Sequence, residues 1–236
     1  MKPVAIFRHS ATEGPGYFAT VLDAHRIPWR LTKIDAGEPV PEEPQAFSGL
    51  CFMGGPMSVN DDLPWIAPVL DLIRAAVRSE IPVIGHCLGG QLMAKALGGL
   101  VSRNPVKEIG WGTARAVEGD AAQRWLGELR EFLAFHWHGE TFSIPTGAAR
   151  ILESPFCANQ AFALGPHLAL QCHVEMTPEL IRAWCRDWDK EVAALAKLTP
   201  SVQTPAQIIE DIEPRVRDLN AVADRLYARW IEGLRD

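Results

Sequence analysis

The sequence predicts an α/β protein with a doubly wound, mostly parallel sheet and flanking helices. Its 236 residues are 47% apolar and 22% charged, which is the composition of an ordinary soluble globular protein. Short apolar runs rich in β-branched residues alternate with longer segments of helical periodicity. That alternation is typical of βαβ units, in which helices cover both faces of a parallel sheet.

The individual elements follow from these two patterns. Helical periodicity is found in residues 17–25, 65–79 and 91–97, each after an apolar run. In the first part of the chain, the strand candidates are residues 4–7, 29–34, 50–53 and 82–85. Further strand candidates are residues 113–117, 149–153, 160–164 and 168–172.

The chain changes in character after Thr177. Residues 178–198 and 205–234 carry apolar side chains at intervals of three and four, so each segment predicts one amphipathic helix. Because an apolar stripe usually faces the protein's own core, we expect both helices to pack on the sheet rather than to form a partner-binding surface. We therefore expect one main domain in residues 1–198 and a C-terminal helical extension in residues 199–236, packed on the same domain.

Composition excludes several function classes. A formal charge of −6 without a basic cluster disfavours a nucleic-acid partner. The N-terminal apolar run is too short for a signal peptide, and no segment is long enough for a membrane span, so we expect a cytoplasmic protein with no membrane partner. The five cysteines are odd in number and form no CxxC pair, which argues against a disulfide framework or a structural zinc site.

The segment PVIGHCLGGQLMAKALGG places Cys87 at the junction of a buried strand and a helix. This junction lies at the carboxyl edge of the sheet, where open α/β sheets bind ligands. Glycines at positions 85, 89 and 90 allow a tight bend and close approach of a substrate. The free N–H groups of the following helix favour a thiolate and can hold an oxyanion. The pattern predicts a cysteine nucleophile rather than a merely packed cysteine.

A thiolate nucleophile needs a base, and the base needs an orienting group. His173 ends the strand-like run LALQCH, and Glu175 follows two residues later, so both side chains point the same way in an extended segment. His136 and His138 have the HxH spacing of metal ligands, but no third ligand lies at a recognisable spacing, and we expect no metal. The remaining candidates, His9, His25 and His167, are predicted to be surface or loop residues, and the other four cysteines to be packing residues.

Four segments in order carry a family resemblance: CFMGGPMSVND, PVIGHCLGGQLMAKALGG, EIGW with the later FHWHGETFSIP, and NQAFALGPHLALQCHVEMT. With these motifs, residues 3–180 resemble the class I glutamine amidotransferases. Within that family they look most like the stand-alone proteins related to the glutaminase domain of GMP synthase. The resemblance implies a flavodoxin-like fold and hydrolysis of the glutamine side-chain amide to glutamate and ammonia by a Cys-His-Glu triad.

The resemblance also implies roles for individual residues. Cys87 resembles the nucleophile, His173 the base and Glu175 the orienting acid. The backbone amides of Gly55 and Leu88 resemble the oxyanion hole. The implied substrate-binding residues are Gly54, Gln91, Trp137 and His138. The substrate is a small molecule, and no cofactor is implied.

Three features depart from the family pattern. Gly90 stands where many members have a histidine, and His86 precedes the cysteine. Cys172 and Val174 replace the phenylalanine and proline of the commoner QFHPE motif. Finally, the residues after Thr177 are too few for a synthetase domain and carry no Gly-rich phosphate loop. We therefore expect any ammonia acceptor or synthetase partner to be a separate molecule.

Two other functions are compatible with the residues. A γ-glutamyl peptidase or hydrolase uses the same triad and acyl-enzyme but releases an amine other than ammonia. A non-catalytic thiol sensor or binding module of similar fold would leave His173, Glu175 and the GGPMS loop without a role. Side-by-side kinetics on glutamine and on γ-glutamyl amides would separate these functions.

Overall fold

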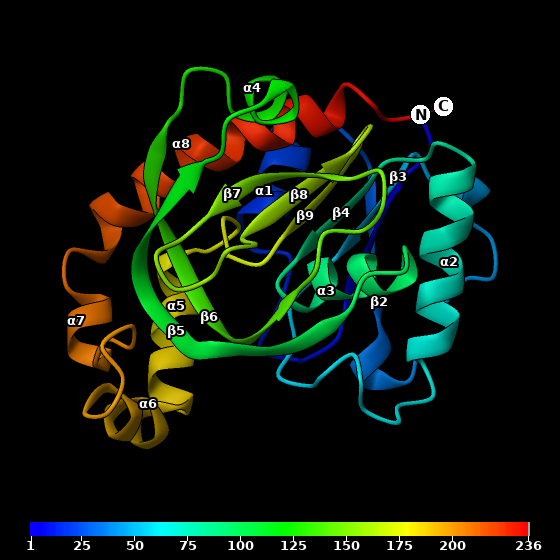
Figure 1. The fold of residues 1–236 in the computed structure, drawn as a ribbon. Helices are drawn as coiled ribbons and strands as arrows, with labels where there is room; N and C mark the ends of the chain where they lie inside the picture. The colour runs from blue at the N-terminus through cyan, green and yellow to red at the C-terminus, as the bar shows by residue number, and fades with distance from the viewer. Residues whose placement is uncertain (236) are drawn as a thin grey trace.

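Nine strands form one sheet at the centre of the protein (Figure 1). In chain order they are β1 (Val4–Arg8), β2 (Trp29–Lys33), β3 (Gly49–Phe52), β4 (Val83–His86), β5 (Val101–Ala116), β6 (Glu131–Phe142), β7 (Ala149–Glu153), β8 (Ala161–Leu164) and β9 (His167–Leu170). The computed structural model describes residues 1–235, and the strand order within them is β2-β1-β3-β4-β9-β8-β7-β5-β6. Pairing is parallel from β2 to β9 and antiparallel from β9 to β6. The predicted α/β class is confirmed, with an antiparallel half added to the parallel one.

Helices cover both faces of this sheet. They are α1 (Gly16–Ala24), α2 (Ile66–Arg78), α3 (Leu88–Ala96), α4 (Asp120–Leu126), α5 (Pro178–Asp187), α6 (Asp189–Ala196), α7 (Pro205–Ile209) and α8 (Ile212–Ile231), with short 3₁₀ turns at Ile34–Ala36 and Pro44–Ala46. Successive side chains of a strand point to opposite faces. In β1, Val4 and Ile6 therefore join the core beneath α1 and α8, whereas Ala5 and Phe7 join the core beneath α2 and α3.

The antiparallel half differs most from the prediction. The predicted strand at residues 113–117 is only the end of β5, and β6 was not predicted at all. These two strands pair along most of their length, from Val101↔Phe142 to Arg115↔Glu131. Histidine, glutamate and glycine interrupt the apolar alternation in FHWHGETF, because this strand faces a polar site on one side. These polar residues therefore obscure the apolar alternation by which a strand is predicted.

Each predicted C-terminal helix is divided into two. The segment 178–198 bends at Trp188, between α5 and α6. The segment 205–234 breaks before α8 at Asp211, which has a left-handed φ of 49°. Asparagine and aspartate tolerate this conformation better than other non-glycine residues, so a helical apolar pattern can continue across such a break.

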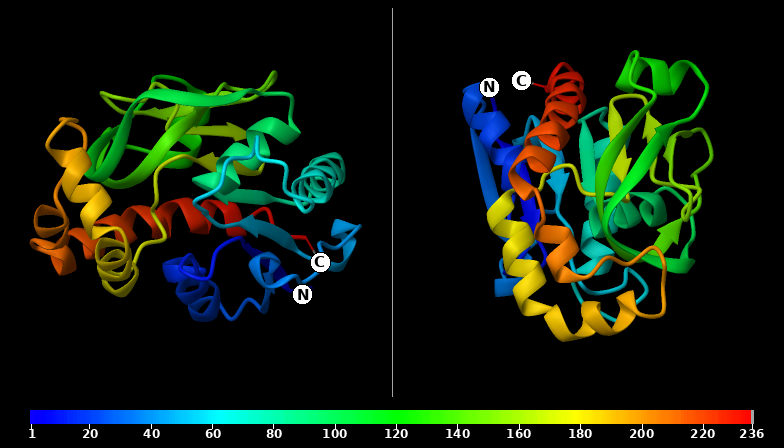
Figure 2. Two further views of the ribbon diagram at one scale, coloured as in Figure 1. Left: turned by 90° about the horizontal axis from the view of Figure 1, so that it is seen from below. Right: turned by 90° about the vertical axis from the view of Figure 1, so that its left-hand side faces the viewer.

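Helix α8 lies between α1 and β6, as the views in Figure 2 show. Its fully buried Tyr227 and Trp230 both pack edge-on against Phe18 of α1, with ring centroids 4.9 and 5.5 Å apart. Edge-on aromatic pairs stabilise a fold by more than the buried area of their rings alone. We propose that the C-terminal helices form one folding unit with residues 1–198. Within residues 1–235, no helix combines the length and apolarity needed to cross a lipid bilayer.

Two histidines that were predicted to be surface or loop residues are buried. His9 is 2% exposed and shares a hydrogen bond between its Nδ1 and the Met53 carbonyl, 3.0 Å away. His167 is 3% exposed and its Nδ1 accepts from the Val83 amide at 3.2 Å. Burial lowers the pKa of each to about 4, so both are neutral at pH 7. The surface placement was wrong because a polar residue at a strand end can be buried when backbone groups satisfy it.

The fold brings four loops to one edge of the sheet. Strands β1, β3, β4 and β9 are mutually parallel, so their carboxyl ends share that edge. The loops that follow them carry Glu13, Gly54, Cys87 and His173 respectively. In open α/β sheets, this edge is where ligands bind.

Candidate active site

Cys87 occupies a strained turn between β4 and α3. Its φ of 51° and ψ of −106° lie outside the regions that side chains with a Cβ ordinarily adopt. The Cys87 amide donates to the Leu170 carbonyl at 2.8 Å, which ties the turn to β9. Backbone strain of this kind is found at functional sites, where the surrounding structure holds it in place.

His173 and Glu175 form a buried pair beside this turn. His173 Nδ1 lies 2.7 Å from Glu175 Oε1, and the two residues are 1% and 3% exposed. The other ring nitrogen, Nε2, is buried and has no partner other than Cys87 within residues 1–235, so it is available to the sulfur. The His173 amide donates to the Phe135 carbonyl at 2.8 Å, and Trp184 packs edge-on against the ring at 5.1 Å. These contacts fix the orientation of the imidazole.

Charge determines the protonation of this pair. Burial alone would lower the pKa of His173, but the charges of Glu175 and Cys87 raise it well above its ordinary value. Burial would raise the pKa of Glu175, but His173 and His86 lower it to about 2. The stable state at neutral pH is therefore an imidazolium held by a carboxylate, which is a proton donor fixed beside a sulfur.

Two glutamines form a chain that ends at the nucleophile. Gln171 Nε2 donates to Cys87 Sγ at 3.6 Å, and Gln171 Oε1 accepts from Gln91 Nε2 at 3.1 Å. On its other side, Cys87 Sγ lies 3.9 Å from the Trp137 carbonyl oxygen. Gln91 lines the cavity, and its side-chain Nε2 is bound to Gln171. The expected contact of Gln91 with substrate stays a prediction. Sequence reasoning missed Gln171, because an alternating strand pattern does not reveal which polar residue faces the sulfur.

The expected oxyanion-hole residues lie close together. Leu88 begins α3, and the first amides of a helix have no intrahelical acceptor. Gly55 lines the cavity, and a Cβ placed on it would lie 2.7 Å from the Leu88 side chain. The two residues therefore meet beside Cys87, and a side chain at position 55 would have to displace those of Met57 and Leu88.

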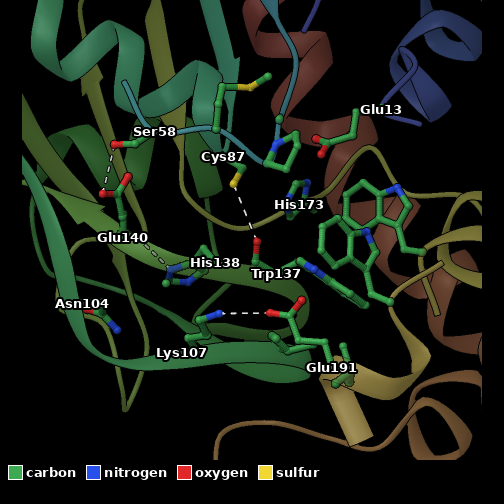
Figure 3. Close-up of a pocket in the computed structure, with 18 of the residues that line it drawn as sticks. Glu13, Ser58, Cys87, Asn104, Lys107, Trp137, His138, Glu140, His173 and Glu191 are labelled. Atoms are coloured by element: carbon green, nitrogen blue, oxygen red, sulfur yellow. Dashed lines mark hydrogen bonds and ion pairs between the residues drawn. The ribbon is translucent and has the colours of Figure 1, made fainter. Parts of the chain in front are cut away.

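Glu13 is a site residue that the sequence analysis did not find. A Cβ added at Gly54 would lie 2.1 Å from Glu13 Oε2 and 3.3 Å from His173 Cε1. The Glu13 carboxyl group thus occupies the space next to Gly54 that the resemblance assigned to substrate, and it borders His173 (Figure 3). Burial and the nearby Glu175 charge raise its pKa to about 7, although His173 opposes the shift.

We expect Glu13→Gln to change the pH dependence of stability. The raised pKa means that folding favours the protonated acid, so its stabilising effect is complete below pH 4.5 and is lost as pH rises through about 7. Measured relative to the wild type, the free energy of unfolding of the variant should rise by on the order of 2 kcal/mol from pH 4 to pH 8. Thermal melts across that range measure the gain. Exposed Glu42→Gln is the control, and parallel Tm curves for Glu13→Gln and the wild type would contradict the expectation.

A polar network supports the strand behind Trp137. His138 Nε2 lies 3.1 Å from Glu108 Oε2, and Glu108 also accepts from Ser154 at 2.8 Å and from Gln160 at 2.7 Å. Burial would raise the pKa of Glu108, but the hydrogen bond with His138 and other contacts lower it overall. His138 lines the cavity as expected, yet its ring is held by protein partners. It therefore positions the cavity wall.

The HxH pair does acquire a third group that spacing did not reveal. This third group is Glu108. Each of Glu108, His136 and His138 is buried and offers one possible ligand atom, and these three atoms lie within 4.8 Å of one another. Antiparallel pairing explains this, since Glu108 lies directly opposite His138. Ser154 and Gln160 already donate to the two carboxylate oxygens of Glu108, so the charge of Glu108 is stabilised without a cation. The expectation of no metal stays a prediction.

A cavity of about 790 Å³ opens over Cys87 (Figure 3). Ser58, His138 and Glu140 lie on one side of the sulfur, and His173 and Glu13 lie on the other. Cavities of this volume accommodate drug-sized ligands.

Known proteins share this sequence and architecture. The family model described as glutamine amidotransferase class-I matches residues 23–183. The chain belongs to the class I glutamine amidotransferases. A solved structure of a glutamine amidotransferase from Methylobacillus flagellatus is 47% identical, covers 100% of this chain and 96% of its own, and superposes with a TM-score of 0.97.

Two curated relatives of this chain are matched over different shares of their length. The glutamine amidotransferase-like protein YfeJ of Salmonella typhimurium is 29% identical over 78% of this chain and 80% of its own. One component of the glutamine-hydrolysing GMP synthase from Sulfolobus acidocaldarius is 34% identical, over 48% of this chain and 57% of its own. The resemblance found in the motifs is thereby confirmed at the level of the family.

The structure explains two departures of this chain from the family motif. A Cβ at Gly90 would lie 2.5 Å from the Leu170 carbonyl oxygen, so β9 leaves no space for the histidine of other members. His86 is fully buried, with Nε2 3.0 Å from the Tyr227 hydroxyl and 4.0 Å from Glu175 Oε2. Helix α8 therefore reaches the back of the His173–Glu175 pair, a long-range contact that no local sequence pattern signals.

Proposed function

We propose that the protein hydrolyses the side-chain amide of glutamine to glutamate and ammonia through a γ-glutamyl thioester on Cys87. The observation that carries the proposal is a cysteine in a strained turn beside a buried His173–Glu175 pair, at the floor of a cavity. In this proposal, Cys87 is the nucleophile, His173 the general acid and base, and Glu175 the group that orients the imidazole and stabilises its charge.

The first half-reaction forms the thioester. The Cys87 thiolate attacks the amide carbon, and its carbonyl oxygen becomes an oxyanion held by the Gly55 and Leu88 amides. The C–N bond then breaks as the His173 imidazolium gives its proton to the departing nitrogen. The products of this half are ammonia, a γ-glutamyl thioester and a neutral imidazole.

The second half-reaction regenerates the enzyme. Neutral His173 takes a proton from water, and the resulting hydroxide adds to the thioester carbon. The C–S bond breaks, glutamate leaves, and the thiolate–imidazolium pair is restored. Throughout both halves, Glu175 keeps the imidazole in one tautomer.

The cavity also fits the amino-acid end of the substrate. Arg103 and Glu140 are cross-strand neighbours that both line it, and the Ser58 hydroxyl holds Glu140 at 3.1 Å. This side can pair one cation with a free α-carboxylate and one carboxylate with a free α-ammonium group. We therefore propose a substrate with an unsubstituted γ-glutamyl head group.

A second candidate is a γ-glutamyl hydrolase that releases a larger amine. The cavity volume of about 790 Å³ favours it, because ammonia needs no extended space beyond His173. If glutamine is the substrate, a synthetase partner would accept the ammonia in trans, as the likeness to one component of a GMP synthase suggests.

A glutamine-analogue electrophile tests the proposal directly. We expect a diazoketone analogue of norleucine to add one adduct to the protein, located by mass spectrometry on the peptide that contains Cys87, with parallel loss of hydrolysis. Excess glutamine should protect against the adduct. Labelling of Cys51 or Cys172 instead would contradict the assignment.

A further inference from the structure

The cavity continues past His173 into a space that the proposed hydrolysis of glutamine does not use. In the acylation step, the leaving nitrogen must face the proton donor, which is His173 Nε2. Any substituent on that nitrogen therefore lies on the His173 side of Cys87. The side proposed above for the γ-glutamyl head group, near Ser58 and Glu140, lies across the sulfur from His173 (Figure 3).

Three tryptophans form the wall of the His173 side. Trp184 packs edge-on against His173, and Trp137 packs edge-on against Trp184 at 5.5 Å. Trp184 is anchored by a hydrogen bond from its Nε1 to the Thr12 carbonyl at 2.9 Å. Trp188 lines the same cavity and remains 41% exposed. The wall is thus rigid at its base, with a large aromatic surface open to solvent at its rim.

The position of Trp188 follows from the bend between α5 and α6. The bend places its indole at the cavity instead of in the core, where the periodicity of one continuous helix would have directed it. A single exposed aromatic residue is common on protein surfaces. An exposed tryptophan that extends a wall of buried Trp184 and half-buried Trp137 into a cavity is typical of a ligand site.

The charged groups on this side limit the kind of ligand. Lys107 is paired with Glu191, with Nζ 3.5 Å from Oε1, across the far end of the cavity. Glu13 and Asp187 add carboxyl groups to the lining. A leaving group with its own carboxylate would meet these acids and a lysine that is already paired, whereas an uncharged aromatic ring meets the tryptophans.

We propose that the His173 side of the cavity is a subsite for the leaving amine, and that the preferred substrates are γ-glutamyl amides whose leaving amine carries an uncharged aromatic ring. The inference rests on the proposed acyl-enzyme chemistry of Cys87 and names its substrate class. The γ-glutamyl C–N bond breaks as above, and the proton from His173 leaves with that amine in place of ammonia.

Matched amides test the subsite. γ-Glutamyl benzylamide and γ-glutamyl methylamide differ in the basicity of the leaving amine as well as in the ring, so the change of their kcat/KM ratio in a rim variant is what reports contacts with the ring. We expect a ratio of roughly 10 for the full-length protein, the size of a few aromatic contacts. γ-Glutamyl-phenylalanine, which adds a carboxylate to the leaving amine, should fall below the benzylamide.

Substitutions at the rim locate the effect. Trp188→Ala should lower the benzylamide-to-methylamide ratio by about 3- to 10-fold, and Trp188→Phe should retain most of it. Phe156→Ala removes an equally exposed aromatic ring, 43% exposed, that does not line the cavity, and it should leave the ratio unchanged.

The inference is overturned if the two amides are turned over equally, or if Trp188→Ala leaves the ratio at its original value. The second result would favour a surface for a synthetase partner. Failure of the proposed function is a separate result, because in that case the diazoketone would not label Cys87 and neither amide would be hydrolysed.

Discussion

Replacing Cys87 with glycine is expected to abolish amide hydrolysis and, at the same time, to yield a more stable protein than replacement with alanine. Loss of the nucleophile should reduce turnover by on the order of 10⁴- to 10⁶-fold, as when other acyl-transfer enzymes lose theirs. Both variants lose the sulfur, so a difference in their stability reports the backbone alone.

The stability difference arises from the turn. With a φ of 51° and a ψ of −106°, position 87 requires a conformation that glycine adopts freely and alanine does not. Strain of this kind costs about 1–3 kcal/mol, and the greater chain entropy of unfolded glycine offsets part of the gain. In a chain of this size, each kcal/mol corresponds to a Tm change of about 2–4 °C. Calorimetry of the two variants measures it.

Cys185→Ala is the matched control, because it removes a buried thiol away from the turn. It should retain hydrolysis. If Cys87→Gly and Cys87→Ala melt at the same temperature, the turn holds no strain that favours glycine. If either variant still hydrolyses substrate at the wild-type rate, Cys87 is not the nucleophile.

Local patterns predicted those parts of the molecule that local physics determines. The first four strands lie within one or two residues of their predicted bounds, and β1, β3 and β4 are buried parallel strands with a nearly continuous apolar run. The turn at Cys87 was predictable because glycine, cysteine and a helical pattern adjoin in sequence. His173 and Glu175 were predictable as a pair, because two residues in an extended segment share a face.

Groups that meet only through the tertiary fold were not predictable. Glu13 reaches His173 because β1 and β9 end at the same edge of the sheet, although the two residues are far apart in sequence. Tyr227 contacts His86 because α8 crosses behind the parallel strands. Neither contact has a sequence signature, since a lone glutamate in a loop and a tyrosine in an amphipathic helix are ordinary residues there.

We expect Glu175→Gln to fold but to lower kcat/KM by about 10³- to 10⁴-fold, the loss seen when an orienting carboxylate of a catalytic triad becomes an amide. The amide still fits beside His173, but it cannot stabilise an imidazolium. Because Glu175 raises the pKa of His173, its removal should also move the basic limb of the pH–rate profile to lower pH. Kinetics across pH 5–10 measure both effects.

The same substitution should have a pH-dependent effect on stability, and this tests the ion pair independently of turnover. The pKa of Glu175 is lowered to about 2, so its contribution is complete above its unfolded value of 4.5 and is lost as pH falls toward 2. Glu175→Gln should therefore be less stable than the wild type at pH 6 and approach it below pH 4. Exposed Glu179→Gln, in the first turn of α5, is the control and should show neither effect. A folded Glu175→Gln variant with an unchanged rate and pH profile would remove Glu175 from the proposed triad, because an orienting carboxylate cannot be lost without releasing the proton that it holds on His173.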